Sequence, residues 1–403
     1  MPNRLAIAPS SVKYRALRAL AGLENILRGH QPTTPQHLSS IRNFLFLQYD
    51  TPLGSAVHAT PLYEAIQLQL PDATIFVAAS PMAAGVLRHN PFLDRCVVTP
   101  APSQSFTGAL RALRQLYAQL PPGPVCIATT ASNQRPTLAM LALLTGKATR
   151  LGYTLATPLY SLPLEYDADR PQIESNLDIL RALHPGTFSH AAPIPEATPE
   201  PRIFFSREDA AYATRVLAEA SVTADHPRIA FVTQSSGGQP KLWSVERFRR
   251  VIAELHATRR AIPIFLGTSD DAAAVEALRQ PLSEQGISLA GKTTIPQLAA
   301  VLAQCDAILS LDTGTFHVAR AVQLPGVVIA PAWQNPSEWL PLRNPRYRIL
   351  CGAMIPMPTS KYWIQEVSTE QVLASLDALL TAYPPSASAR AARLHRALAK
   401  KTP

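Results

Sequence analysis

The stretch SLDTGTFHVARAVQLPGVVIA, residues 310–330, decides the fold. An apolar run over 307–311 predicts a buried strand that ends just inside this stretch, and the spacing over 316–322 predicts a helix. A second apolar run, 326–329, predicts the next strand. A strand, a helix and another strand in this order indicate a parallel sheet covered by helices.

The same alternation extends outward over most of the chain. Further strands are predicted at 44–48, 73–78, 125–128, 228–233, 263–266 and 288–290, and further helices at 56–70, 173–183, 207–220, 245–257, 271–284 and 295–304. The proline-rich run AAPIPEATPEPRI, residues 191–203, separates two halves of similar size and is typical of an approach to a linker. The pattern therefore predicts an α/β protein with two Rossmann-like lobes.

Five segments follow from this pattern. They are a basic N-terminal extension at 1–40, a first lobe at 41–195, a linker with a helix at 196–227, a second lobe at 228–375, and a C-terminal helix with a basic tail at 376–403.

Charge is concentrated at the two ends. The net charge is +9, of which residues 1–40 carry +4 and residues 386–403 carry +5. Residues 11–29 and 390–401 also have amphipathic spacing, which predicts peripheral contact with an anionic membrane surface. The alternatives are solvated tails, or apolar faces that pack on the protein itself.

The composition limits the remaining classes of protein. Hydrophobic residues make up 47% of the chain and charged residues 16%, which is ample for a core. The apolar runs are far shorter than the roughly 20 residues of a membrane span. Four cysteines without a CxxC pair fit a cytoplasmic protein and predict no metal site. No nucleic-acid-binding motif is found, so nucleic acid is not an expected partner.

The loop after the strand at 307–311 has the chemistry of an anion site. Asp312, Thr313 and Gly314 precede the predicted helix, and His317 lies one turn into it. Glycine allows a close approach of the backbone, and the start of a helix attracts negative charge through its free N–H groups and dipole. The alternative is an ordinary helix cap beside a buried histidine.

A second loop has the materials of a diphosphate cradle. In FVTQSSGGQPKLWSVERF, residues 231–248, a strand leads into a Ser/Gly loop that contains Ser236, and Lys241 stands just before a helix. Hydroxyls, flexible backbone and an ammonium group suit phosphate oxygens. The alternative is a flexible loop with a surface lysine.

Taken together, these motifs resemble those of glycosyltransferase family 9, the ADP-heptose:lipopolysaccharide heptosyltransferases. The resemblance covers roughly residues 41–375 and rests on the segments 51–61, 174–183, 231–248 and 289–321. The positions that match the family's motifs in the second half are Lys241, Trp243, Glu246, Phe248, Leu289, Gly291, Thr293, Leu298, Ala299, Leu302, Asp306, Asp312, Thr313, Gly314, His317, Ala319 and Ala321.

The resemblance implies a GT-B fold and an inverting, metal-independent enzyme without a cofactor. It transfers a sugar from a nucleotide-diphosphate donor to a cell-envelope glycan or a lipid-linked acceptor; heptose and ADP are the family's default. On this basis Asp312 and His317 position a sugar. Thr313 and Gly314 hold the diphosphate, and Ser236 with Lys241 binds its other oxygens. Asp271, or its neighbour Asp270, binds the ribose, and Thr293 lines the base pocket.

The first lobe departs from the family at its proposed general base. The family has an acid after Leu-Gly, whereas this chain has Ser55 after Gly54. Asp50 on the same loop and His58, one helical turn after Ser55, are the two replacements, and a third alternative is that neither acts as the base. A member that binds nucleotide sugar or a partner without catalysis is the main alternative function. A nucleotide-sugar epimerase of the same shape is another.

Overall fold

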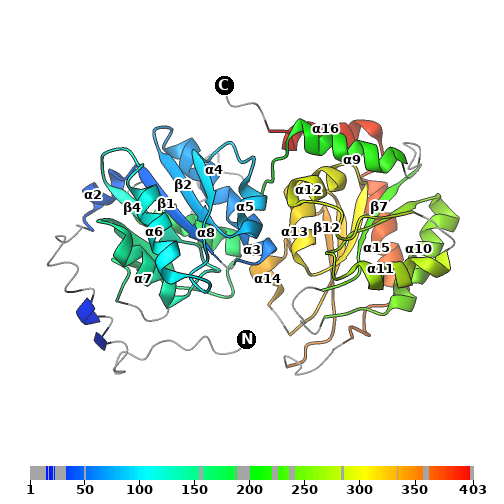
Figure 1. Cartoon of the computed structure of the whole chain (residues 1–403). Helices are drawn as coiled ribbons and strands as arrows, with labels where there is room; N and C mark the ends of the chain where they lie inside the picture. The colour runs from blue at the N-terminus through cyan, green and yellow to red at the C-terminus, as the bar shows by residue number, and fades with distance from the viewer. Residues whose placement is uncertain are drawn as a thin grey trace. The chain divides into compact units, whose positions relative to one another are not determined.

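The computed structural model divides the chain into two compact units, residues 1–201 and 202–403 (Figure 1). It describes residues 15–16, 18–20, 22, 33–49, 51–153, 158–185, 187, 200–219, 226–235, 241–282, 286–333, 335–356 and 363–399. Within these ranges no helix is long and apolar enough to cross a membrane.

The first unit is built on a six-stranded parallel sheet. Its strands are β1 Asn43–Gln48, β2 Thr74–Ala79, β3 Arg95–Val98, β4 Val125–Thr129, β5 Thr149–Tyr153 and β6 Leu162–Leu164. They lie in the order β3-β2-β1-β4-β5-β6, and every neighbouring pair is parallel. Strand order reverses between β1 and β4, so the loops after these two strands open a crevice where ligands of such sheets bind.

Helices cover both faces of this sheet. They are α2 Pro35–Ser39, α3 Leu53–His58, α4 Thr60–Gln69, α5 Pro81–Leu87, α6 Phe106–Tyr117, α7 Pro136–Thr145 and α8 Gln172–Leu183. Leu45 and Leu47 of β1 face the layer formed by α6 and α7. The alternate residue Phe46 faces the other way, where its ring meets that of Tyr63 on α4 edge to face. This alternation is why β1, buried on both faces, reads as a continuous apolar run.

The second unit repeats the plan. Its strands are β7 Arg228–Val232, β8 Ile262–Phe265, β9 Ile287–Ser288, β10 Ala307–Leu311, β11 Gly326–Ala330 and β12 Tyr347–Cys351. They are parallel and lie in the order β12-β11-β10-β7-β8-β9, so the reversal falls between β7 and β10.

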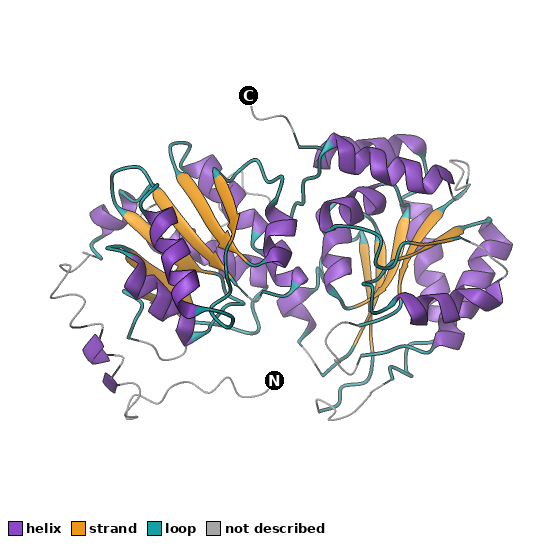
Figure 2. Cartoon of the chain, viewed as in Figure 1, coloured by secondary structure: helices purple, strands orange, loops and turns teal. Residues whose placement is uncertain are grey.

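The helices of the second unit also form two layers (Figure 2). They are α9 Arg207–Glu219, α10 Val245–Arg259, α11 Ala272–Arg279, α12 Ile295–Ala303, α13 Gly314–Ala321, α14 Pro336–Trp339, α15 Thr369–Ala382 and α16 Ala387–Ala397, with a 3₁₀ turn at Gln280–Leu282. Helices α10, α11 and α15 share one hydrophobic cluster with the sheet. Helix α9, which falls in the predicted linker, packs on α12 of this unit.

One predicted boundary is wrong in a way that affects the site. A single helix was expected over 56–70, but α3 begins at Leu53 and the helix breaks at Ala59 before α4. Pro52 is the extended residue that precedes α3. Pro61 lies in the first turn of α4, where a proline is tolerated because its missing N–H has no partner within the helix. Gly54 and Ser55 therefore belong to a helical turn.

The C-terminal helix is attached to its own unit. Arg390 of α16 is 5% exposed, and its Nε donates to Asp306 Oδ1 over 2.9 Å. Arg393 donates to the carbonyl oxygens of Ala303 and Cys305, at the end of α12. The sequence placed these two arginines on a tail that contacts a membrane. In the structure they bind within the second unit, where Arg390 pairs with the Asp306 carboxylate and Arg393 donates to carbonyl oxygens at the end of α12.

Candidate functional site

The crevice of the second sheet carries polar residues at the ends of its two central strands. Thr233 directly follows β7, and Asp312 and Thr313 directly follow β10. Because β7 and β10 are parallel neighbours at the point where strand order reverses, their carboxyl ends lie side by side. We refer to these residues, together with Lys241 and His317, as the β7–β10 site.

An ion pair lies at its centre. Lys241 Nζ donates to Asp312 Oδ2 over 3.4 Å, and each side chain is 8% exposed. Two neighbours fix the lysine: Leu242 forms a β-bridge with Trp363, and Trp243 is buried with its Nε1 donating to Val367 O. A buried ammonium held this way is a pre-positioned partner for phosphate oxygens, because little side-chain freedom remains to be lost on binding.

His317 extends the pair into a triad. Its Nε2 lies 4.0 Å from Asp312 Oδ1, and the side chain is buried on the first turns of α13. Burial lowers the pKa of His317 to about 4; the Asp312 carboxylate opposes this, whereas Arg320 and Lys241 lower the pKa further. The imidazole is therefore neutral near pH 7 and acts as a hydrogen-bonding group rather than a cation.

Two hydroxyl groups of the site lack partners among the described residues. Thr233 Oγ1 and Thr313 Oγ1 are buried, and neither makes a hydrogen bond there. An unsatisfied buried hydroxyl costs about 1–3 kcal/mol, so a pair of them at a strand crevice points to a ligand that supplies the missing oxygen atoms.

The start of α13 adds backbone donors. Gly314 is its first residue, and Thr313 precedes it without a side-chain capping bond. The first N–H groups of a helix then remain directed at the space before it, where the helix dipole favours negative charge. The arrangement brings together five of the predicted positions: Lys241, Asp312, Thr313, Gly314 and His317.

Asp271 and Thr293 lie on the neighbouring turns after β8 and β9. Gly291 N donates to Gly267 O over 3.0 Å, which joins the two turns. Gly291 has a φ of +71°, and a Cβ there would meet the backbone of Ser269 at 2.8 Å. One oxygen of Asp271, Oδ2, already accepts from the backbone N and the hydroxyl of Thr268. The Asp271 carboxylate therefore holds the turn after β8 in place through Oδ2. Its contact with a ribose stays a prediction.

In the first unit, the turn after β1 is anchored by two asparagines. Asn133 Nδ2 donates to Tyr49 O over 2.8 Å, and Asn176 Nδ2 donates to His58 O over 2.9 Å. The two bonds fix both ends of the segment that leads through α3. Asp50 lies between these anchors but outside the described residues, as does Ser236 in the second unit.

Ser55 and His58 are enclosed in the first unit. Ser55 is 3% exposed and His58 is 1% exposed, and both belong to α3 with Gly54. A general base must approach the acceptor hydroxyl to about 3 Å. The enclosure of His58 therefore argues against His58 as this base.

Thr233 of the β7–β10 site, and Arg320, whose charge acts on His317, were missed by sequence reasoning. Thr233 reads as the last residue of a strand, and Arg320, which is 7% exposed, reads as a surface residue of a helix. The signal that could have found Thr233 is its position at the carboxyl end of a central strand. Nothing in the sequence marked Arg320.

Two units, each built on a parallel sheet of the Rossmann order, are the architecture of the GT-B class of glycosyltransferases. Solved structures share this fold. The glycosyl transferase family 9 protein from Veillonella parvula superposes with a TM-score of 0.72 at 18% identity, covering 85% of this chain and 99% of that one. The Escherichia coli heptosyltransferase WaaC, solved with ADP-2-deoxy-2-fluoro heptose, gives 0.60 at 14% identity, with coverages of 83% and 99%.

The sequence agrees with the fold. The profile of "Glycosyltransferase family 9 (heptosyltransferase)" matches residues 137–362, which is more than half of the chain. The chain belongs to glycosyltransferase family 9. One curated relative, lipopolysaccharide heptosyltransferase 3 of Escherichia coli, is 28% identical over 148 residues, and the match spans 35% of this chain and 43% of that protein.

Proposed function

We propose that this protein transfers a sugar from a nucleotide-diphosphate donor to a glycan or lipid-linked acceptor of the lipopolysaccharide core. The donor is ADP-heptose-like, by analogy with the ligand named for WaaC. The transfer inverts the anomeric carbon and requires no metal. The reaction takes place in the cytoplasm, in line with the four separated, unpaired cysteines.

The observation that carries the proposal is the β7–β10 site. Lys241 supplies positive charge, Thr233 and Thr313 supply unsatisfied hydroxyls, and α13 supplies backbone donors. These are the groups that a diphosphate needs, and they remain in place as the diphosphate leaves with its developing charge. Asp312 and the neutral His317 are then available for sugar hydroxyls.

In this proposal the acceptor is bound by the first unit, where Asp50 removes the proton of the attacking hydroxyl. What supports a site at this turn is the anchoring of the described backbone near it, where Asn133 and Asn176 donate to the carbonyl oxygens of Tyr49 and His58.

Calorimetric titration with ADP, followed by assay of sugar transfer from ADP-heptose to a truncated lipopolysaccharide core, tests the proposal. Binding of ADP and formation of the extended core support it; a chain that binds neither ADP nor another nucleoside diphosphate contradicts it. The alternative, a member that binds nucleotide sugar without catalysis, is favoured by Ser55 in place of the family's acid. It predicts ADP binding without turnover.

A further inference from the structure

A stretch of 70 residues in the first unit contains no acidic side chain. Residues 95–164 hold no Asp or Glu, although the whole chain has 28 acids among its 403 residues. The same stretch holds six cations, namely Arg95, Arg111, Arg114, Arg135, Lys147 and Arg150. A segment of this length with one sign of charge creates a field that selects for anionic partners.

The fold gathers these charges on one layer of the unit. The stretch contains α6 and α7, which lie against each other and cover one face of the sheet. Arg150 is buried and donates to Leu159 O, whereas the other five cations are exposed. We call this surface, defined by Arg95, Arg111, Arg114, Arg135 and Lys147, the α6–α7 face.

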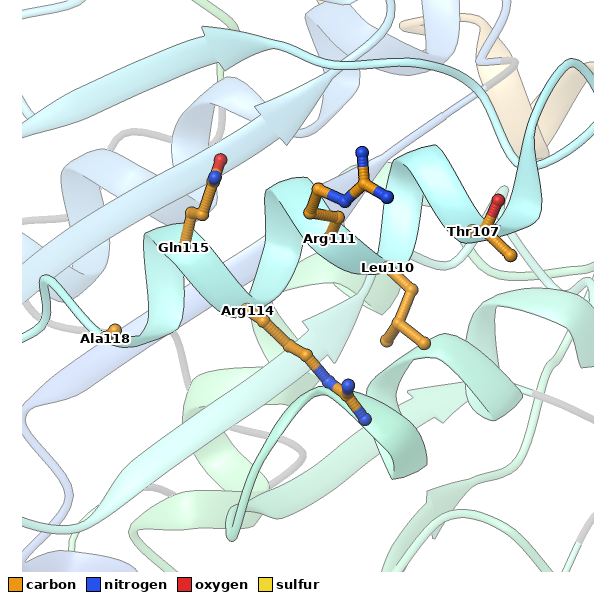
Figure 3. A pocket seen from close by; sticks show the side chains of 6 residues that line it. All are labelled: Thr107, Leu110, Arg111, Arg114, Gln115 and Ala118. Carbon is orange, nitrogen blue, oxygen red and sulfur yellow. The ribbon is translucent and has the colours of Figure 1, made fainter.

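A shallow pocket of about 500 Å³ lies along α6 on this face (Figure 3). It is lined by Thr107, Leu110, Arg111, Arg114, Gln115 and Ala118. Leu110 and Arg114 point to one side of the helix, and Arg111 points to the other. Arg114 also donates to Leu144 O, near the end of α7, so its charge is held in place. Basic and apolar side chains are thus interleaved along an exposed helix.

The N-terminal segment adds charge to the same layer. Leu20 packs against a cluster that contains Ala139 and Leu143 of α7. Arg15 and Arg18, close to Leu20 in sequence, are exposed. By contrast, Arg390 and Arg393 of the C-terminal helix are engaged within the second unit.

We propose that the α6–α7 face binds the surface of an anionic lipid bilayer. Exposed cations beside an apolar side chain, here Leu110, which lines the pocket and is partly buried against the core, are features of interfacial binding. The purpose of this membrane binding rests on the proposed function, because an enzyme that acts on a lipid-linked acceptor must reach a membrane. The binding itself requires neither donor nor turnover.

A nucleic acid fits this face less well. Sequence-tolerant binding of single strands uses exposed aromatic rings for stacking. The aromatic residues of α6, Phe106 and Tyr117, are partly buried against the core, and the Tyr117 hydroxyl donates to Lys147 O. Within the described part of residues 95–164, Val98 is the exposed large hydrophobic side chain, and it is not aromatic.

Co-sedimentation of the full chain with vesicles of equal parts phosphatidylglycerol and phosphatidylcholine tests the proposal. The variant Arg111→Glu/Lys147→Glu reverses two charges of the face. We expect its partition coefficient to fall by about 25-fold or more, because each lost cation contributes roughly a fivefold factor near an anionic surface. Added salt should weaken the binding of the unaltered chain as well.

The control is Arg215→Glu/Arg250→Glu, which makes the same change in net charge on exposed helix positions of the second unit. It should bind vesicles nearly as well as the unaltered chain. Equal losses in the two variants, no loss in the α6–α7 variant, or tighter binding of duplex DNA that the same substitutions abolish would each overturn the proposal. ADP affinity, measured on the same samples, reports separately on the proposed function and should not change in either variant.

Discussion

Replacing Lys241 with alanine removes the ammonium group from the centre of the β7–β10 site. Its Nζ lies 3.4 Å from Asp312 Oδ2 at a position where both side chains are 8% exposed, so the charge is little screened by water. A charge-assisted hydrogen bond contributes about 1.5–3 kcal/mol, so we expect the Kd for ADP to rise by roughly 10- to 150-fold.

The pairing with Asp312 makes this prediction sharper. In Lys241→Ala the Asp312 carboxylate is left without its cation beside a neutral His317, so it opposes binding of the diphosphate. Asp312→Asn in the same chain removes that repulsion, so the double variant should bind ADP more tightly than Lys241→Ala alone. The two substitutions should therefore be non-additive, as expected for residues in direct contact.

Isothermal titration with ADP measures all three variants, and thermal unfolding checks that each one is folded. Lys147→Ala, an exposed lysine of the first unit, is the matched control and should leave the Kd unchanged. An unchanged Kd in Lys241→Ala, or strictly additive effects in the double variant, would refute this account of the site.

Four further predictions follow from the described contacts. Thr313→Val and Thr233→Val each remove an unsatisfied hydroxyl, so thermal stability should hold or rise while the Kd for ADP rises about tenfold; unchanged affinity would exclude ligand contact by these groups. Because burial lowers the pKa of His317 to about 4, below its usual value of about 6.5, its stabilising neutral form is lost as pH falls between these values. Denaturant unfolding of the unaltered chain should therefore lose about 3 kcal/mol more than His317→Gln between pH 7 and pH 4, and parallel pH profiles would count against the shift. Arg390→Ala breaks a buried ion pair and should lower the free energy of unfolding by about 3 kcal/mol or more, whereas the exposed Arg396→Ala on the same helix should cost less than about 1 kcal/mol. Asp50→Asn should reduce turnover by about 100-fold with ADP affinity nearly unchanged, and His58→Ala should have the smaller effect; the reverse order would make His58 the base.

The architecture was predictable because its central strands are buried on both faces. Runs such as Phe44–Gln48 and Ala307–Leu311 have no polar alternation, which is the signature of a parallel sheet between helices, and both strands are present. The strands β3, β5, β6 and β12 were not predicted. Strands β3, β6 and β12 lie at sheet edges and are partly exposed, so their sequences resemble loops. Strand β5 is fully buried, but Arg150 and Gly152 interrupt its apolar pattern.

The start of α3 was misjudged for a local reason. Proline, glycine and serine at 52, 54 and 55 have loop propensity, but packing encloses this helix so fully that tertiary contacts override that preference. Lys241, Asp312 and His317 were predicted as a group, and the structure brings them together.

The contacts that the sequence did not predict join residues that lie far apart in the chain. Arg390 was read as part of a basic tail because its partner, Asp306, is 84 residues away, and no local pattern reveals that contact. The neutral state of His317 likewise follows from burial, which the sequence does not show.

The first and last described segments of the second unit lie side by side. Phe205, near its start, pairs with Leu398, near the end of the described chain, through bonds from Phe205 N to Ala397 O and from Ala399 N to Phe205 O. A unit whose first and last segments are hydrogen-bonded to each other can be cut out of its parent chain, or reopened at a surface loop with its original ends joined by a short linker, without stretching any strand. The β7–β10 site lies wholly within this unit and would be carried with it.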